Sequence, residues 1–314
     1  MTMTRNVLLL TLLLIQGMAF PSNPASAQSA FPIIEQSVDE VDWSRTVNEE
    51  PVNRFRKQAL QAVIVSGGYL ASTRGDLNQS FIEASLKLGV PLGNFENILG
   101  VTPSFRVDFL DPYSGLRTDV PAELFETGVS FFYRRPLTER LSVMGIVRPS
   151  IRSDFTTSQN AFRLFGLGLV NWECIPDELT LSAGAVFLDR ADLPLLPAVG
   201  LTWTPQPTLK ADLQFPTSKL SFRIAKDGNQ SETWSYLSAG IGGNTWAVTR
   251  ASNLSDELTL REMRLVLGVD HLTDGGGGYF AEVGFLFNRR IEYQVDQSQF
   301  GLSDGIVLQA GWRF

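Results

Sequence analysis

The sequence predicts an all-β fold, a single antiparallel up-and-down transmembrane β-barrel of about 12–14 strands. Three observations predict it: an N-terminal export segment, strand-length runs with two-residue alternation, and a final strand that ends on an aromatic residue. In a barrel wall, the two faces of each strand meet lipid and water, so apolar and polar residues must alternate. Beyond the export segment, no apolar stretch reaches the roughly 20 residues that a membrane-spanning helix needs.

The first 27 residues have the three parts of a secretory signal peptide. Arg5 supplies the positive region, residues 7–15 form the apolar run, and residues 25–27 (Ala-Ser-Ala) form the small-residue cleavage site. We therefore expect export and cleavage near Ala27. The expected location of the mature protein is the outer membrane.

The remaining chain divides into two parts. Residues 28–57 are polar and charged and are expected to form an unanchored periplasmic tail, with capping of the lumen as the alternative, whereas residues 58–314 are expected to form the barrel. Pro, Gly, Asn and Asp turns separate fourteen candidate strands, counting a short pair within 208–225. These strands are 60–70, 80–90, 98–109, 123–134, 140–150, 161–172, 179–189, 195–204, 208–215, 218–225, 233–250, 256–270, 278–290 and 302–314. Gly240 to Gly243 are expected to mark a bend in the strand 233–250.

Alternation is the main signal for a barrel wall. In the strand 98–109, apolar residues from Leu99 to Phe109 share one face, while Thr102, Ser104, Arg106 and Asp108 share the other. The same split recurs in the strands 123–134, 208–215 and 218–225. In 278–290, Tyr279 to Phe287 are expected to point outward, with Glu282, Gly284 and Asn288 pointing inward. One face suits lipid and the other suits water.

Three strands alternate poorly, namely 140–150, 161–172 and 195–204. Their inward positions are expected to be apolar or glycine, which a soluble β-sandwich would also produce. A secreted or periplasmic soluble β-sandwich that binds a ligand or partner is therefore the alternative fold and function.

Charged residues at inward positions are the candidate functional residues. Ten of them form the predicted lumen network: Arg106, Asp108, Glu126, Arg134, Lys210, Asp212, Arg223, Glu262, Arg264 and Glu282. Glu83, Lys87 and Arg163 complete the inward set, which holds seven basic and six acidic residues. Such charges either ring a pore that small solutes cross or pair across the lumen and seal it. The intermediate strand count favours the sealed or narrow form.

Composition limits the chemistry of this protein. The formal charge of -7, without a Lys/Arg-rich run, argues against nucleic acid as a partner. One Cys (Cys174) and one His (His271) cannot build the usual zinc clusters or an internal disulfide. We expect no catalytic residue, no cofactor and no metal site. The third and least favoured hypothesis, an outer-membrane hydrolase, would have to use His271 at a strand end.

The last strand carries a further pattern. Ile306, Leu308, Trp312 and Phe314 share one face with Ala310, and the chain ends on the aromatic residue. This face resembles the terminal assembly signal of bacterial outer-membrane proteins. The resemblance implies two partners, outer-membrane lipid and the machinery that assembles barrels in that membrane.

Several longer motifs carry a family resemblance. They are 193–205 (LPLLPAVGLTWTP), 213–216 (LQFP), 220–224 (LSFRI), 242–248 (GGNTWAV), 264–268 (RLVLG) and 281–289 (AEVGFLFNR). Over roughly residues 60–314, the chain resembles an uncharacterised domain-of-unknown-function family of bacterial outer-membrane β-barrels. The resemblance implies the barrel fold and transfers no substrate, cofactor or catalytic residue. The favoured hypothesis is a non-enzymatic outer-membrane barrel, either a passive channel or a structural envelope protein with a mixed-charge lumen.

Overall fold

The computed structural model describes residues 52–56, 58–92, 94–112, 119–187 and 195–314. The predicted signal peptide and residues 28–51 of the predicted tail lie outside this part of the chain. Within the described residues, no helix is long and apolar enough to cross a membrane.

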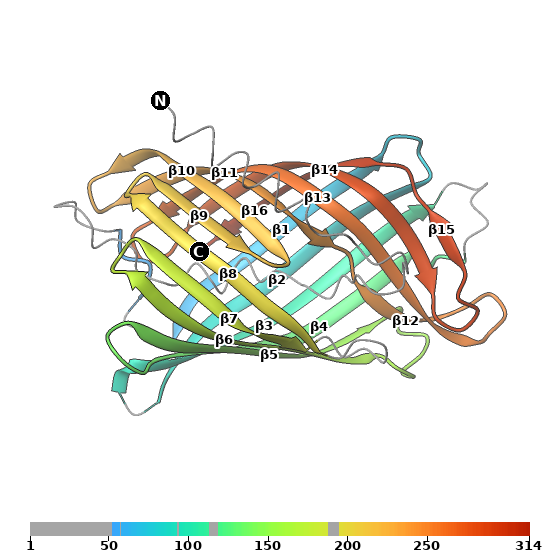
Figure 1. Ribbon diagram of the computed structural model, residues 1–314. Helices are drawn as coiled ribbons and strands as arrows, with labels where there is room; N and C mark the ends of the chain where they lie inside the picture. The colour runs from blue at the N-terminus through green and yellow to red at the C-terminus, as the bar shows by residue number, and fades with distance from the viewer. Residues whose placement is uncertain (1–51, 57, 93, 113–118, 188–194) are drawn as a thin grey trace.

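The described residues form strands that close into one barrel (Figure 1). The strands are β1 (Leu60–Ser72), β2 (Leu77–Leu92), β3 (Asn94–Pro112), β4 (Glu123–Pro136), β5 (Leu141–Ser153), β6 (Phe162–Ile175), β7 (Leu179–Phe187), β8 (Leu195–Gln206), β9 (Leu209–Gln214), β10 (Thr217–Asp227), β11 (Ser231–Gly242), β12 (Thr245–Thr249), β13 (Ser255–Thr273), β14 (Gly278–Tyr293), β15 (Gln299–Gly301) and β16 (Gly305–Arg313). Fourteen of them form an antiparallel ring, while β12 and β15 are short additions to β13 and β14. The predicted barrel is confirmed, and the alternative of a β-sandwich is wrong.

The seam of the barrel lies between the first and last strands. β1 and β16 pair in register from Ile64 opposite Arg313 to Ser72 opposite Gly305. The N–H of Phe314 also donates to the carbonyl of Val63 at 2.9 Å. Because every wall strand then has two neighbours, the ring has no open edge, which is the condition for strands in a hydrocarbon environment.

The barrel has two different ends. At the turn end, both the start of β1 and the end of β16 are found, and the connections are short, such as 137–140, 176–178 and 207–208. At the loop end, longer connections such as 154–161 join the strands, and β12 and β15 lie there (Figure 1, right). This arrangement follows the loop pattern of bacterial membrane barrels.

The two faces of the wall differ as the alternation predicts. Large apolar side chains lie open on the outer face, for example Val199, Ile224 and Leu308, which are 64%, 61% and 57% exposed. On the inner face, Asp108 and Glu126 are 0% and 1% exposed. A soluble protein would bury such a continuous apolar surface, so the outer wall suits contact with lipid.

The strands that alternate poorly have mixed inner faces. β5 continues three residues past its predicted end at 150, and its buried inward positions include Arg148, Ser150 and Arg152. The expectation of purely apolar or glycine inward positions is therefore wrong for β5. The expectation of apolar inward positions is right for part of strands β5 to β8. A buried apolar cluster lies there on the inner face, formed by Met144, Ile146, Phe165, Leu169, Val186 and Ala198.

Two backbone irregularities change the direction of strands. The predicted strand 233–250 breaks into β11 and β12 at Gly243, which has a φ of +101°. A Cβ at this position would overlap the carbonyl oxygen of Leu260, so only glycine fits. The predicted bend is confirmed.

The second irregularity is a bulge in β14. The register of β13 with β14 shifts between Arg261 and Met263, and Asn288 adopts a φ of +52°. The bulge reverses the alternation, so Asn288 is exposed and Arg289 is buried. The predicted inward position of Asn288 is wrong because a sequence pattern with a fixed period of two cannot anticipate an inserted residue.

Candidate functional site: the lumen

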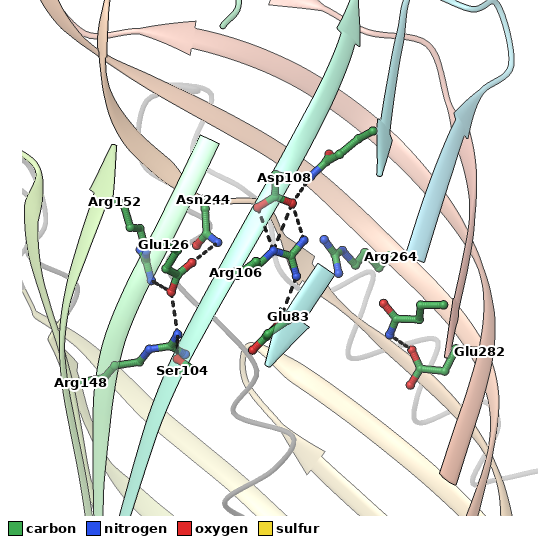
Figure 2. A network of polar contacts seen from close by, with 12 residues as sticks. Glu83, Ser104, Arg106, Asp108, Glu126, Arg148, Arg152, Asn244, Arg264 and Glu282 are labelled. Carbon is green, nitrogen blue, oxygen red and sulfur yellow. Dashed lines mark hydrogen bonds and ion pairs between the residues drawn. The ribbon is translucent and has the colours of Figure 1, made fainter. Parts of the chain in front are cut away.

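A ladder of alternating charge crosses four neighbouring strands on the inner wall (Figure 2). Glu83 on β2 is opposite Arg106 on β3, Arg106 is opposite Glu126 on β4, and Glu126 is opposite Arg152 on β5. Directly opposite residues in antiparallel strands have Cβ atoms about 4.5–5.5 Å apart. The strand register therefore brings these opposite charges together, and we call the four residues the charge ladder.

In the first half of the charge ladder, Arg106 contacts two carboxylates. Its Nη2 and Nε lie 2.6 and 2.9 Å from the carboxylate of Asp108, and its Nη1 lies 3.5 Å from Glu83 Oε2. Asp108 is two residues further along β3, so both side chains share the inner face. Asp108 also accepts a hydrogen bond of 2.8 Å from Gln79. These hydrogen bonds offset the energetic cost of burying the Asp108 carboxylate.

Glu126 receives three donors in the second half of the ladder. Arg148 Nη2 and Arg152 Nη2 lie 2.7 and 3.2 Å from its Oε1, and Asn244 Nδ2 donates to its Oε2 at 3.3 Å. Arg148 also donates to Ser104 at 3.2 Å. Asn244 lies between β11 and β12, so this bond joins the wall at β4 to the connection leading into β12 (Figure 2).

A second charged cluster lies on β13 and β14. Nε and Nη2 of Arg264 lie 2.7 and 2.5 Å from Glu262 Oε1, and Arg289 Nε lies 3.7 Å from Glu262 Oε2. Arg264 and Glu262 are two residues apart, whereas Arg289 faces inward because of the bulge at Asn288. The Glu262 carboxylate thus contacts two guanidinium groups.

Glu282, also on β14, is held by neutral donors. It accepts hydrogen bonds from the Tyr236 hydroxyl and from the Gln309 amide. Tyr236 is only 4% exposed and faces the lumen. Its ring therefore lies on the inner face of the wall.

Three further ion pairs lie toward the turn end. Lys210 Nζ is 2.9 Å from Asp212 Oδ2 on β9. Arg223 Nη1 is 3.9 Å from Glu232 Oε2, and Arg54 Nη2, from the chain before β1, is 2.7 Å from Glu232 Oε1.

The structure therefore distributes the predicted network residues over several clusters. Nine of the ten take part in the carboxylate contacts given above: Arg106, Asp108, Glu126, Lys210, Asp212, Arg223, Glu262, Arg264 and Glu282. Arg134 lies apart, near the turn end of β4, where it donates to Ser142 Oγ at 3.4 Å. Most of these contacts join neighbouring strands, whereas the Glu126–Asn244 and Glu282–Tyr236 hydrogen bonds reach further around the barrel.

Three of the arginines on wall strands that take part in these clusters were not predicted, and neither was Arg54 before β1. Arg148 belongs to a strand that was read as apolar on its inner face, and Arg152 lies beyond the predicted strand end. The alternation of Arg148, Ser150 and Arg152 in the sequence could have identified both. No sequence pattern places Arg289 on the inner face, because the bulge that turns it inward is not visible in the alternation.

The loop end of the lumen is spanned by a hairpin. We call residues 245–260, which include β12 and the first part of β13, the plug hairpin. β12 pairs with β13 and also forms a parallel bridge to β5, where Ala247 is opposite Ser153. In the fourteen-strand ring, six strands separate β13 from β5 on either side. The hairpin therefore crosses the mouth from one wall to the opposite one (Figure 1).

An apolar core fills the space around the plug hairpin. Trp246, Val248, Leu258 and Leu260 from the hairpin are all buried, and Trp246 is only 2% exposed. They pack with residues that surround the mouth, which are Leu77, Leu110, Leu124, Ile291, Tyr293 and Leu302. Each such side chain contributes roughly 1.5–3 kcal/mol when fully buried. Trp246 is therefore part of the apolar core at the mouth.

Polar contacts hold the tip of the plug hairpin. Arg250 lies 3.1 Å from Asp119 and 2.9 Å from Asp256, and its guanidinium stacks 3.7 Å from the centre of the Tyr293 ring. The N–H of Thr249 donates to Asp154 at 3.0 Å. Burial alone would lower the pKa of Arg250, but the hydrogen bonds to Asp256 and Asp119 raise it above its usual value. Arg250 therefore stays charged at any physiological pH.

The turn end is partly covered by residues 52–56. Arg56 Nε donates to the carbonyl of Gly275 at 2.9 Å, and the N–H of Gly275 donates to the carbonyl of Asn53 at 2.7 Å. Val52 is buried. The end of the predicted tail thus contacts the turn between β13 and β14.

A cavity of about 260 Å³ lies between these two ends. Arg54 and Phe55 line it at the turn end, and Trp246 and Leu260 of the plug hairpin line it at the loop end. Its charged lining residues comprise seven basic side chains, which are Arg54, Lys87, Arg106, Arg148, Lys219, Arg264 and Arg313. Five are acidic, namely Glu83, Glu126, Glu262, Asp270 and Glu282. Basic side chains therefore outnumber acidic ones by two among these lining residues, and Arg54 and Arg106 pair with Glu232 and Asp108, which lie outside the lining.

His271 lies outside the lumen. Its ring stacks on Tyr279 with centroids 4.9 Å apart, and Tyr279 stacks on Trp312 at 5.4 Å. Both aromatic partners are about half exposed on the outer face, and His271 Nδ1 contacts Thr233 Oγ1 at 2.9 Å. The cluster suits the headgroup level of a bilayer, where amphipathic rings are enriched.

Comparison with known proteins identifies a family. The model described as Domain of unknown function (DUF6268) matches residues 113–271, which is half of the chain. This chain belongs to that family. The resemblance to a domain-of-unknown-function family is thereby confirmed, and DUF6268 brings no assigned activity. Comparison with curated protein sequences finds no match.

Solved structures similar to this DUF6268 chain are distant barrels. The beta domain of the Bordetella autotransporter BrkA has a TM-score of 0.40 at 12% identity, covering 82% of this chain and 99% of that one. Pseudomonas aeruginosa OccK5 (OpdH) has a TM-score of 0.32 at 11% identity, with coverages of 83% and 99%. Acinetobacter baumannii outer membrane protein Omp33 has a TM-score of 0.30 at 11% identity, with coverages of 82% and 100%. The barrel fold itself is established by the strand pairing of this chain.

Proposed function

We propose that this protein is a non-enzymatic outer-membrane β-barrel whose lumen is closed in the resting state, and that it serves as a structural protein of the envelope. The observation that carries the proposal is the plug hairpin. It crosses the mouth between opposite walls, and its apolar core and charged tip contacts hold it there. A water-filled pore has no need for such a core.

The outer surface supports a membrane location. Its apolar side chains form the surface that lipid requires, and closure removes the unpaired strand edges that hydrocarbon does not tolerate. The turn end would face the periplasm and the loop end the exterior, following the usual loop pattern. Ile306, Leu308, Trp312 and Phe314 on β16 would present the assembly signal.

The inner charges support a structural role. Glu126 and Asp108 are engaged by guanidinium groups at short distances, and Glu282 by neutral donors. Buried carboxylates paired in this way hold neighbouring strands together, whereas a general base must be available to a substrate. We therefore propose no enzymatic activity.

A passive channel for small solutes is the second candidate. The cavity favours it, because a purely structural barrel has no need for an internal space lined by twelve charged residues. In this candidate, the plug hairpin leaves the mouth from time to time and the lumen then conducts.

A reversible disulfide across the mouth distinguishes the two candidates. Ser153→Cys and Ala247→Cys, in a Cys174→Ser background, join the bridge partners of β5 and β12, which pair closely enough for a disulfide. Planar-bilayer conductance is then recorded before and after reduction. A structural barrel stays silent in both states, whereas a channel conducts in steps only when reduced.

Deletion of residues 245–259, with a two-glycine connection, provides the control for insertion. This variant should conduct continuously because the mouth has lost its core. Heat-dependent gel migration would show that the shortened barrel is folded. The proposal of a closed lumen would be wrong if wild type conducted steadily and the double-cysteine variant conducted equally before and after reduction.

A further inference from the structure

Arg264 presents an unusual guanidinium group inside the cavity. Its side chain is 40% exposed, although the plug hairpin lines the roof of the cavity. Nε and Nη2 both contact Glu262 Oε1, which leaves Nη1 without a partner among the described residues. A Cβ at Gly242 would overlap Arg264 Nε, so the glycine makes the room in which this side chain lies.

Arg264 has no carboxylate of its own. Glu262 contacts both Arg264 and Arg289, so its charge is shared between two guanidinium groups. A guanidinium group that shares its carboxylate partner and faces a space with low-dielectric walls attracts an anion.

Aromatic rings hold two other cations of the cavity along its wall. The Arg106 guanidinium lies 3.9 Å from the centre of the Phe81 ring, and Lys219 Nζ lies 3.9 Å from the centre of the Tyr236 ring. Such cation–π contacts order the positive groups before a ligand arrives. Arg264 has no ring contact of this kind among the described residues, so its guanidinium points to the site where an anion would bind.

The remaining lining is partly apolar. Ile241, Leu260, Val266, Leu272 and Val307 contribute to the same cavity. At the roof, the indole N–H of the buried Trp246 has no acceptor among the described residues. An apolar lining with a few convergent polar groups is typical of small-molecule sites, and the volume lies near the lower end of their range of roughly 300–1,000 Å³.

We infer that the cavity binds a small organic acid, a carboxylate with a short apolar body, with the carboxylate on Arg264 and the apolar part against the aliphatic lining. The ligand would reach the site from the turn end, a direction that rests on the proposed closure of the mouth. The binding itself does not depend on that closure, so it can be measured on the protein in detergent.

Isothermal titration calorimetry of the refolded chain, residues 28–314, tests the inference with three probes. Butyrate has the expected negative charge and a short apolar chain. Butylammonium has a similar apolar chain with a positive charge, and inorganic phosphate has a negative charge without an apolar chain. We expect butyrate to bind, phosphate to bind more weakly and butylammonium not to bind. Binding of phosphate alone would overturn the organic-acid assignment, and absence of binding by butyrate and phosphate would overturn the site.

Variants at Arg264 locate the carboxylate. Arg264→Gln should weaken butyrate binding about tenfold or more, as the loss of a charge-assisted hydrogen bond predicts. Gly242→Ala should weaken it as well, because the new Cβ displaces Arg264 without removing the charge. Arg134→Gln is the matched control, since Arg134 does not line the cavity.

Heat-dependent gel migration confirms that each variant folds. If Arg264→Gln or Gly242→Ala fails to fold, Arg264→Lys retains the charge, loses the planar two-donor geometry, and should still weaken binding. Unchanged butyrate affinity in the folded Arg264 variants would exclude this residue as the anchor. Conductance plays no part in these measurements, so their failure would leave the proposed function untouched.

Discussion

At the scale of single residues, Glu126 illustrates how the wall is stabilised. Its carboxylate is shared by Arg148 and Arg152, and all three side chains are buried. Replacing Glu126 by Gln would leave two buried guanidinium groups without their carboxylate. We expect a loss of about 3–5 kcal/mol in the free energy of unfolding, measured by urea titration of the barrel in lipid vesicles. Glu139→Gln, in the exposed turn 137–140, should leave this value nearly unchanged.

Asp76 makes the loop end sensitive to acid. Partial burial alone would raise its pKa, but hydrogen bonds from Ser72 and from the backbone N–H groups of Ser303 and Leu77 outweigh burial and lower the pKa below 3.8. A carboxylate with a lowered pKa stabilises the folded state fully above its unfolded value, and this contribution is lost as the pH falls through the folded value.

The stability difference between wild type and Asp76→Asn should therefore shrink as the pH falls below 3.8. Thermal unfolding of both proteins between about pH 6 and about pH 3 measures it. A difference that stays constant over this range would contradict the assigned role of Asp76.

At the scale of elements, the plug hairpin depends on the turn at Gly243. With a φ of +101° and no room for a Cβ, Gly243→Ala should strain this turn and loosen the hairpin. We expect faster proteolysis within residues 250–254, measured on vesicles with the loop end outside. Gly301→Ala is the matched control, because nothing lies within 4 Å of a Cβ at that position. Equal cleavage rates for the two variants would contradict the role of Gly243.

At the scale of the whole molecule, the barrel closes at the pair formed by β1 and β16. Phe314 joins this seam through its backbone, while its side chain is 57% exposed beside Trp312. If that side chain serves as an assembly signal, Phe314→Ala should lower the amount of folded barrel in outer membranes several-fold. Refolding of the purified variant into detergent should change little, because the backbone contacts remain. An equal loss in both settings would indicate a structural role instead.

The local chemistry of each strand could be read from its residues. Alternation in stretches such as 98–109 identified the wall, and it placed Arg106, Asp108 and Glu126 on the inner face where they are buried. Alternation follows from a backbone with a period of two, which depends on no distant part of the chain. The barrel fold and most of its inward charges were therefore within reach of sequence reasoning.

Which charges meet was decided only by the closed structure. Glu126 finds Arg152 through the register of β4 and β5, Arg289 turns inward through a bulge, and β12 reaches Ser153 only because the ring brings β5 opposite β13. Register, bulges and closure depend on residues far apart in the chain, so no local period encodes them. The sequence by itself determined a membrane-type barrel with a charged interior, and the tertiary structure decided that a hairpin crosses its mouth.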